Sequence, residues 1–315
     1  YILDIKIKKM LNKFFKTIHN KYPRFFKFIF FLRYLLLIFF ISTVILITIP
    51  FFFNYEKRAE VIKNRLTENY NFKLSNYEKI KYNIFPSPNL ELINTQLNFK
   101  FSEENLNVKK IKIFPNFIDF YNYKNFHTKK VIFNDGDMTF QISNLKFFIK
   151  QFTHQKNKIN LENLNLKMND KNTLVIKLNN IKFANYGYKK NLIRGEVFGK
   201  NFKVRIDDNY KNINLSLLNS GIDADINFYN SPKKNIKLGI LKSKILNTNL
   251  KSNFEYDGRT LKIYNSYLRS KSLSLKNESE IIISPYLDIK SKLIVEEFNT
   301  QIFKKINFNE LYKFK

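Results

Sequence analysis

The chain has 315 residues, and its 55 Lys and Arg against 26 Asp and Glu give a formal net charge of +29. Apolar residues make up 44% of the sequence, a fraction too high for a disordered tail. The absence of cysteine excludes disulfides, thiolate metal sites and cysteine nucleophiles. The length suits one large domain or two ordinary ones.

The positive charge is carried by lysine, since only eight of the basic residues are Arg. Proteins that bind nucleic acid favour Arg, whose planar fork pairs with phosphate and with guanine. An AT-rich coding sequence supplies Lys, Asn, Ile, Phe and Tyr, and this bias accounts for much of the charge. We therefore expect no nucleic-acid partner.

A membrane segment is expected at residues 34–53, twenty residues without a charge. Twenty helical residues rise about 30 Å, the thickness of the hydrocarbon core. The run exceeds a secretory signal core and is followed by no small-residue cleavage site, so it predicts an uncleaved anchor. Pro50 lies near its end, and Tyr34, Phe51–Phe53 and Tyr55 suit an aromatic belt at the interfaces.

The flanking charges predict the orientation of this anchor. The leader, residues 1–33, carries nine Lys or Arg against the single Asp4, whereas residues 54–70 carry four basic and three acidic residues. The positive-inside rule places the leader in the cytoplasm and the rest of the chain across the membrane. The sequence begins at Tyr1, and Met10 is a candidate start.

A short amphipathic helix is expected at residues 54–71, just outside the membrane. Ala59, Val61, Ile62 and Leu66 form its apolar stripe, with charged residues on the other side. Beyond it, residues 72–315 lack a Pro-, Gly- or Ser-rich linker and are expected to form one extended β domain.

Alternation of apolar and polar residues replaces the helical period in this domain. Such alternation predicts strands with one apolar and one wet face. Lysines take many of the wet positions. The fold class is therefore mainly β: a large antiparallel sheet, as a groove or a sandwich, after the two helices. The alternating residues are Leu90 and Leu92; Leu97, Phe99 and Phe101; Val108, Ile111 and Ile113; Leu164, Leu166 and Met168; Leu174, Ile176 and Leu178; Ile213, Leu215 and Leu217; Ile222, Ala224, Ile226 and Phe228; Leu273 and Leu275; Leu287 and Ile289.

Turn residues separate these runs. Asp135-Gly136, Asp257-Gly258 and Asn219-Ser220-Gly221 predict hairpins, because Gly, Asn and Asp accept a left-handed backbone. Asn179-Asn180 and Asp208-Asn209 are expected to serve in place of glycine elsewhere. Three similar segments, 159–168, 174–183 and 213–222, either mark a β repeat or reflect a small residue alphabet.

The order of these segments resembles the N-terminus of the AsmA family of bacterial envelope proteins, most clearly over residues 25–150. A basic leader, an anchor and a helix precede a strand that begins at Phe72, and Pro86-Ser87-Pro88 leads into the strand with Leu90 and Leu92. A Phe/Tyr-rich loop at 114–126 follows, and residues 283–289 resemble the start of a strand in the family's C-terminal regions. The family usually has Gly after the first helix, where this chain has Asn69-Tyr70-Asn71.

The resemblance implies an inner-membrane protein with a periplasmic β-groove. We expect it to assist phospholipid transfer or outer-membrane assembly without catalysis, with membrane lipids (phospholipid acyl chains) as partners and other envelope proteins as further candidates. The alternative is an envelope scaffold or adaptor that binds proteins at its sheet edge. The alternation alone leaves open whether the apolar face is an open groove or a closed core.

No residue is a candidate catalytic, cofactor-binding or metal-ligating group, and no cofactor is expected. His19, His127 and His154 are isolated from one another, and Asp135-Gly136-Asp137 has no further ligand at calcium-loop spacing. Adjacent acidic pairs, Glu103-Glu104 and Glu296-Glu297, are expected to point to opposite faces of a strand. The tail, 298–315, is expected to cap the sheet edge as a helix or to contact a lipid surface, and the cap is preferred.

Overall fold

The computed structural model describes residues 8–10, 12–13, 16, 23–99, 104–122, 126–145, 152, 155–207, 211–231 and 236–299. The chain separates into two compact units, residues 1–53 and 54–315. The predictions for His19, Phe101, Glu103, His154, Asp208-Asn209 and residues 300–315 of the tail lie outside the described residues.

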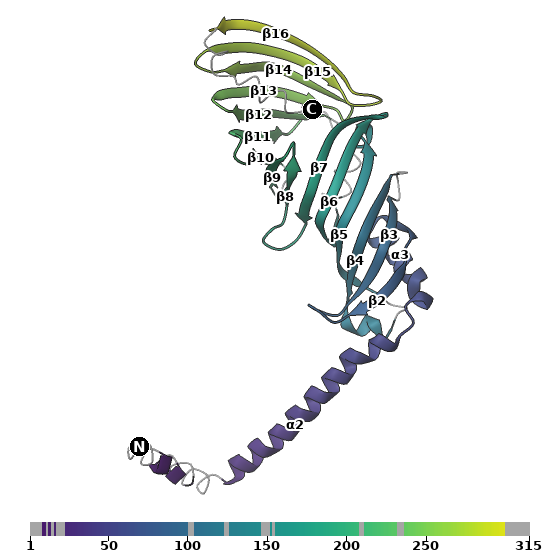
Figure 1. Cartoon of the computed structure of the whole chain (residues 1–315). Coiled ribbons are helices and arrows are strands. Elements are labelled where there is room, and N and C mark those ends of the chain that lie inside the picture. Colours follow the sequence, from purple (N-terminus) through teal and green to yellow (C-terminus); the bar gives the residue numbers. More distant parts are fainter. Residues whose placement is uncertain are drawn as a thin grey trace. The chain divides into compact units, whose positions relative to one another are not determined.

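The first unit contains one long apolar helix, α2, from Pro23 to Thr48 (Figure 1). Its 23-residue stretch Phe30–Phe52, which includes the following 3₁₀ turn η1 (Ile49–Phe52), is long and apolar enough to cross a membrane. The helix begins before the predicted span because Lys27 and Arg33 favour helix as well as leucine does. It ends at Thr48, five residues before the end of the predicted span, since Pro50 cannot continue the hydrogen-bond ladder.

The second unit opens with the short turn η2 (Glu56–Arg58) and the helix α3 (Ala59–Tyr70). Ala59, Ile62, Leu66 and Tyr70 are buried at a spacing of three or four residues, which confirms the predicted amphipathic helix. The helix ends at Asn71, whose φ of 57° is left-handed. Asn71 therefore takes the role that glycine commonly has after a helix.

Strands make up most of the second unit (Figure 1). They are β1 (Phe72–Asn76), β2 (Lys79–Asn83), β3 (Asn89–Phe99), β4 (Asn105–Pro115), β5 (Thr128–Gln141), β6 (Lys158–Asp170), β7 (Thr173–Ala184), β8 (Leu192–Val197), β9 (Lys200–Ile206), β10 (Asn212–Leu217), β11 (Ile222–Tyr229), β12 (Lys237–Ile245), β13 (Thr248–Tyr256), β14 (Thr260–Arg269), β15 (Leu273–Ile282) and β16 (Asp288–Phe298). Short 3₁₀ turns follow β4 (η3, Phe117–Phe120) and β5 (η5, Ile142–Asn144).

All sixteen strands belong to one sheet, in which β1 is followed by β3 and then by every later strand in chain order, while β2 also pairs with β3. The large antiparallel sheet is therefore confirmed, with one exception. β5 and β6 run parallel, so their connection must cross from one end of the sheet to the other.

Left-handed residues lie inside five of the described strands: Asn265 in β14 (φ 48°) and one residue each in β3, β5, β6 and β7. Asn94, Asp135, Asn163 and Asn180 have φ between 47° and 58°, and Asn163 Nδ2 donates to Asp135 Oδ1 at 3.2 Å. The prediction of turns at Asp135-Gly136 and Asn179-Asn180 is wrong, because both lie within strands. The left-handed residue instead shifts the alternation by one position, as in a β-bulge.

The bulge explains a spacing of three between apolar residues on one face. Phe133 and Gly136 of β5 pair with Leu161 and Leu164 of β6, so neighbouring strands shift together and their register stays matched. Val108 and Ile111 of β4 show the same spacing. Asparagine and aspartate suit this position because their side chains tolerate the left-handed region.

Two predicted hairpins are confirmed. Asn219-Ser220-Gly221 joins β10 to β11, and Asp257-Gly258 joins β13 to β14, where Gly258 has a φ of 97°. The alternating pair Leu287 and Ile289 needs a small correction, since β16 begins at Asp288 and leaves Leu287 outside the strand.

Asp257 stabilises its turn through the backbone. Its Oδ1 accepts the N–H groups of Thr260 at 2.8 Å and Arg259 at 2.7 Å, and these bonds hold the pKa of the carboxyl below its ordinary 3.8. A folded pKa below the unfolded one contributes stability above the unfolded value and loses it as the pH falls through the folded value. We expect Asp257→Ala to lower the free energy of unfolding by about 1 kcal/mol at neutral pH.

The loss of unfolding free energy caused by Asp257→Ala should shrink as the medium is acidified below about pH 4. Urea unfolding of the wild-type chain and of Asp257→Ala, at neutral and acidic pH, measures the difference. Asp257→Asn is the matched control, because it keeps an acceptor oxygen without the charge. A difference that does not change with pH would contradict a role for the ionised carboxylate.

Candidate functional site: the apolar face of the sheet

One face of the sheet is apolar across all its strands. Residues paired between neighbouring strands share a face, so the register traces each face from strand to strand. We call this the apolar face and the other the polar face. Two rows illustrate the apolar face: Leu92, Ile111, Phe133, Leu161 and Phe183 from β3 to β7, and Ile193, Val204, Leu215, Ala224, Ser243, Leu250, Leu268, Leu275 and Val295 from β8 to β16.

The polar face carries charged and amide side chains along the same strands. The corresponding row from β8 to β16 contains no apolar residue: Arg194, Lys203, Ser216, Asp223, Lys244, Asn249, Arg269, Ser274 and Glu297. Pairs such as Lys262 Nζ and Glu280 Oε1, 3.6 Å apart, are exposed and contribute little to stability. The lysines therefore lie on the wet face, as the alternation predicts.

Over β1 to β6 and the second half of β7 the apolar face is a closed core. Ile62 and Leu66 of α3 are buried together with Phe72 of β1, and α3 packs against that strand. The ring of Phe152 lies 6.2 Å from that of Phe72 and 6.5 Å from that of Phe183. Phe152, a described residue of the segment between the parallel strands β5 and β6, therefore packs on the apolar face and covers part of it.

Over β8 to β16 the apolar face is not covered in this way. Of the described apolar side chains in these strands, only Phe202 and Phe254 are fully buried. Leu215, Leu241 and Leu268 are half-buried. The described residues between 155 and 299 form strands and turns and include no helix that could serve as a second layer. An apolar surface of this extent is characteristic of a binding site.

The two buried phenylalanines in this region cover glycines. Phe202 pairs with Gly195 and Phe254 pairs with Gly239, and each ring lies close to the backbone of its glycine. Large aromatic side chains commonly cover a glycine in the neighbouring strand. These rings are thus part of the sheet's own packing, which leaves the leucine and isoleucine side chains around them as the accessible apolar surface.

A stripe of hydroxyl and amide groups crosses the apolar face from β13 to β16. The Oγ atoms of Ser252 and Ser266 are 2.6 Å apart, and Asn277 Oδ1 accepts hydrogen bonds from Ser279 at 2.8 Å and Ser291 at 2.9 Å. These groups pair with one another, which offsets the cost of their desolvation. Ser252 and Ser266 are buried, whereas Asn277, Ser279 and Ser291 remain accessible. On β15 and β16 the face therefore offers both apolar contact and hydrogen-bonding groups, a combination that suits an amphipathic ligand.

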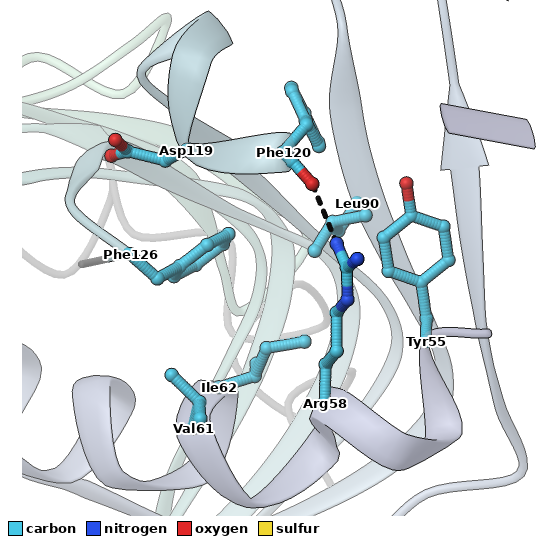
Figure 2. Close-up of a pocket in the computed structure, with 8 residues that line it drawn as sticks. All are labelled: Tyr55, Arg58, Val61, Ile62, Leu90, Asp119, Phe120 and Phe126. Carbon is cyan, nitrogen blue, oxygen red and sulfur yellow. Dashed lines mark hydrogen bonds between the residues drawn. The ribbon is translucent and has the colours of Figure 1, made fainter. Parts of the chain in front are cut away.

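A small cavity lies where the start of α3 meets η3 (Figure 2). Arg58 extends between Tyr55 and Phe120, and its Nη1 donates to the carbonyl oxygen of Phe120 at 2.6 Å. The cavity has a volume of about 10 Å³, the lower limit for one water molecule. It is a packing junction. Tyr55, which was expected at the membrane interface, is instead buried here, with its ring stacked against that of Tyr82. This burial raises the pKa of the Tyr55 phenol.

The predicted loop at 114–126 supplies part of this junction. β4 runs through Phe114 to Pro115, and Phe120 is buried in η3, so the segment is more ordered than a simple loop. Asp119 is also buried, and its Oδ2 accepts the backbone N–H of His127 at 2.8 Å. The Nδ1 of His127 lies 3.5 Å from the same oxygen, so His127 helps to close the loop.

Four of the acidic residues considered in the sequence, Asp135, Asp137, Glu104 and Glu296, are held by structural partners. Asp137 Oδ1 accepts from Asn165 Nδ2 at 3.0 Å, and Glu104 Oε1 accepts from Asn144 Nδ2 at 2.5 Å. Glu296 is the extra residue of a bulge against β15 and pairs with Lys276. Within the described ranges no three His, Cys, Asp or Glu residues lie close enough to hold a metal ion.

A wider recess lies beside the loop between β7 and β8, with a volume of about 590 Å³. Lys182, Lys189 and Arg194 line it together with Glu162 and Tyr186. Its charged and aromatic lining and its open mouth make it a surface depression of mixed character rather than an enclosed binding pocket. The apolar face is the chemically more uniform candidate site.

Comparison with protein-family models, with curated proteins and with solved structures finds no match for the chain. The site therefore has to be interpreted from its own geometry.

Proposed function

We propose that the chain is a membrane-anchored, non-catalytic lipid-binding protein of the AsmA type. The observation that carries the proposal is the apolar face of β8 to β16, which continues from the closed core and remains half-exposed. Acyl chains laid on this face would leave water, at a gain of about 0.8 kcal/mol for each buried methylene. The hydroxyl stripe would receive the polar part of a phospholipid.

The location of the sheet is part of the same proposal. An apolar helix at the N-terminus is long enough to anchor the chain in the inner membrane. The basic leader, with nine Lys or Arg against one Asp in residues 1–33, favours a cytoplasmic N-terminus and a periplasmic sheet. A sheet held there would assist phospholipid transfer or the assembly of the outer membrane.

Site-specific photocrosslinking in membranes tests the lipid proposal. A benzophenone amino acid replaces Leu241 or Leu250 on the apolar face of the full chain, and the neighbouring Lys242 or Lys251 on the polar face serves as the matched control. We expect phospholipid adducts, identified by mass, from the two leucine positions and background labelling from the two lysine positions. Leu241→Asp, with the probe at Leu250, should reduce those adducts.

Two outcomes would overturn the proposal. Equal lipid labelling from both faces would indicate non-specific contact with the bilayer and no binding site on the apolar face. Protein adducts in place of lipid adducts would favour the alternative, an envelope adaptor that binds other proteins at the edge of its sheet.

A further inference from the structure

β16 is the last of the described strands and lies at one edge of the described sheet. It pairs with β15 on one side, and no described strand pairs with its other side. Its apolar side chains are largely exposed, with 60% for Ile289, 62% for Leu293 and 58% for Val295. An edge of 11 residues without proline is a template for the addition of another strand.

The charges on β16 are ordered along the strand. Lys290 and Lys292 lie in its first half, and Glu296 and Glu297 in its second half. On the paired side, β15 matches this order, since Glu280 lies opposite Lys290, Glu278 lies opposite Lys292, and Lys276 pairs with Glu296. A strand added antiparallel to the free side would need acidic residues opposite the two lysines and a basic residue opposite Glu296.

A second copy of β16 that runs antiparallel meets this requirement for Lys292 and Glu296, while Lys290 lies opposite Phe298 of the partner subunit. We propose that two copies of the chain associate edge to edge through β16, around a two-fold axis at Ile294. Lys292 then lies opposite Glu296 of the partner subunit, and Leu293 lies opposite Val295 of the partner subunit. The interface is isologous, so each of these contacts occurs twice.

The neighbouring registers are less favourable. An axis at Lys292 would place two lysines directly opposite each other, which is destabilising. An axis at Leu293 would pair Lys290 with Glu296 of the partner subunit, but it would place Lys292 opposite the partner's Ile294 and Ser291 opposite the partner's Val295, so fewer apolar side chains would meet one another. In the proposed register the apolar faces of both copies lie on the same side and form one continuous surface.

A charge-swap experiment on the full chain in detergent micelles tests the interface. Lys292→Glu alone would place two carboxylates opposite each other in a pair of identical chains, and Glu296→Lys alone would place two lysines together. We expect light scattering after gel filtration to give a dimer for the wild type and a monomer for each variant. An equimolar mixture of the two variants should give a dimer, because both pairs are then complementary.

The mixture also controls for folding. Each variant has the same intramolecular environment alone and in the mixture, so a dimer that appears only on mixing reports the interface. A wild-type monomer, or a mixture that stays monomeric, would overturn the proposal and would leave the lipid proposal untouched. Coverage of the edge by residues 300–315 of the same chain would give this monomeric result.

Disulfide formation tests the register, and the chain offers a clean background because it has no cysteine. Ile294→Cys places two thiols directly opposite each other at the axis, within the distance that a disulfide requires. We expect oxidation in native membranes to link two chains through Ile294→Cys and to link Lys290→Cys far less. Equal linkage at both positions, or linkage at Lys290→Cys alone, would contradict the register.

Discussion

Replacement of Phe72 by alanine is expected to lower the free energy of unfolding by about 3–5 kcal/mol. The Phe72 side chain has no exposed surface, and its ring lies 5.2 Å from the rings of both Phe99 and Phe133. It also contacts Phe152, so one substitution opens a cavity shared by β1, β3, β5 and Phe152. Denaturant unfolding of the detergent-solubilised chain, followed by circular dichroism, measures the loss.

Phe228→Ala is the matched control. Phe228 occupies the same face on β11 but is half-exposed, with its ring 5.6 Å from that of Phe254. We expect it to cost about 1–2 kcal/mol, since less apolar surface leaves contact with protein. Similar losses for the two variants would mean that the apolar face is equally closed along its length, which would contradict the division between a closed core and an accessible surface.

Gly239→Ala is expected to lower the free energy of unfolding by about 1–3 kcal/mol. A Cβ atom at this position would lie 2.7 Å from the carbonyl oxygen of Asn227 and 2.7 Å from Cε1 of Phe254. The phenylalanine ring can turn aside, but the carbonyl belongs to the backbone of β11 and can move only if the strand moves. Thermal and denaturant unfolding of the same preparation measures the effect.

Substitutions at two other glycines distinguish destabilisation by steric crowding from destabilisation by backbone strain. Gly199 has a φ of 71°, and a Cβ atom there would have no other atom within 4 Å. Gly199→Ala therefore measures only the cost of placing alanine in the left-handed region, and we expect it to lower the free energy of unfolding by about 1–2 kcal/mol. Gly136→Ala would meet a methyl of Leu164 at 2.6 Å, which can rotate away, and should be milder than Gly239→Ala. A Gly239→Ala variant as stable as the wild type would show that β11 and β12 can separate without loss.

Alternation of apolar and polar residues is sufficient to predict the sheet and its solvent-exposed lysine face, and an apolar stripe at helical spacing predicts the short amphipathic helix. It does not distinguish a turn from a bulge, because Asn and Asp adopt the left-handed backbone in both. For that reason the turns predicted at Asn180 and Asp135 are wrong. The spacing of three between Leu161 and Leu164, repeated by Leu178 and Ile181, is the available signal that each strand continues.

The boundary between the closed and the accessible parts of the apolar face could not be predicted from the strands alone. It depends on which segments cross the sheet, and the covering residue Phe152 lies outside any alternating run. The glycine partners Phe202 and Phe254 were missed for a related reason, since a strand residue's cross-strand neighbour depends on register. The positions of Gly195 and Gly239 within alternating runs were the available sign that a large side chain of a neighbouring strand covers each glycine.

From β6 to β16 every strand pairs only with the strands that come immediately before and after it in the chain. Such a sheet behaves as a one-dimensional array, in which each new strand needs only the previous one as its template. Loop closure is therefore short at every step, and folding can spread from the closed core toward the C-terminus while the chain is still being made. The length of the apolar face can change by one hairpin at a time without a change in the fold that precedes it.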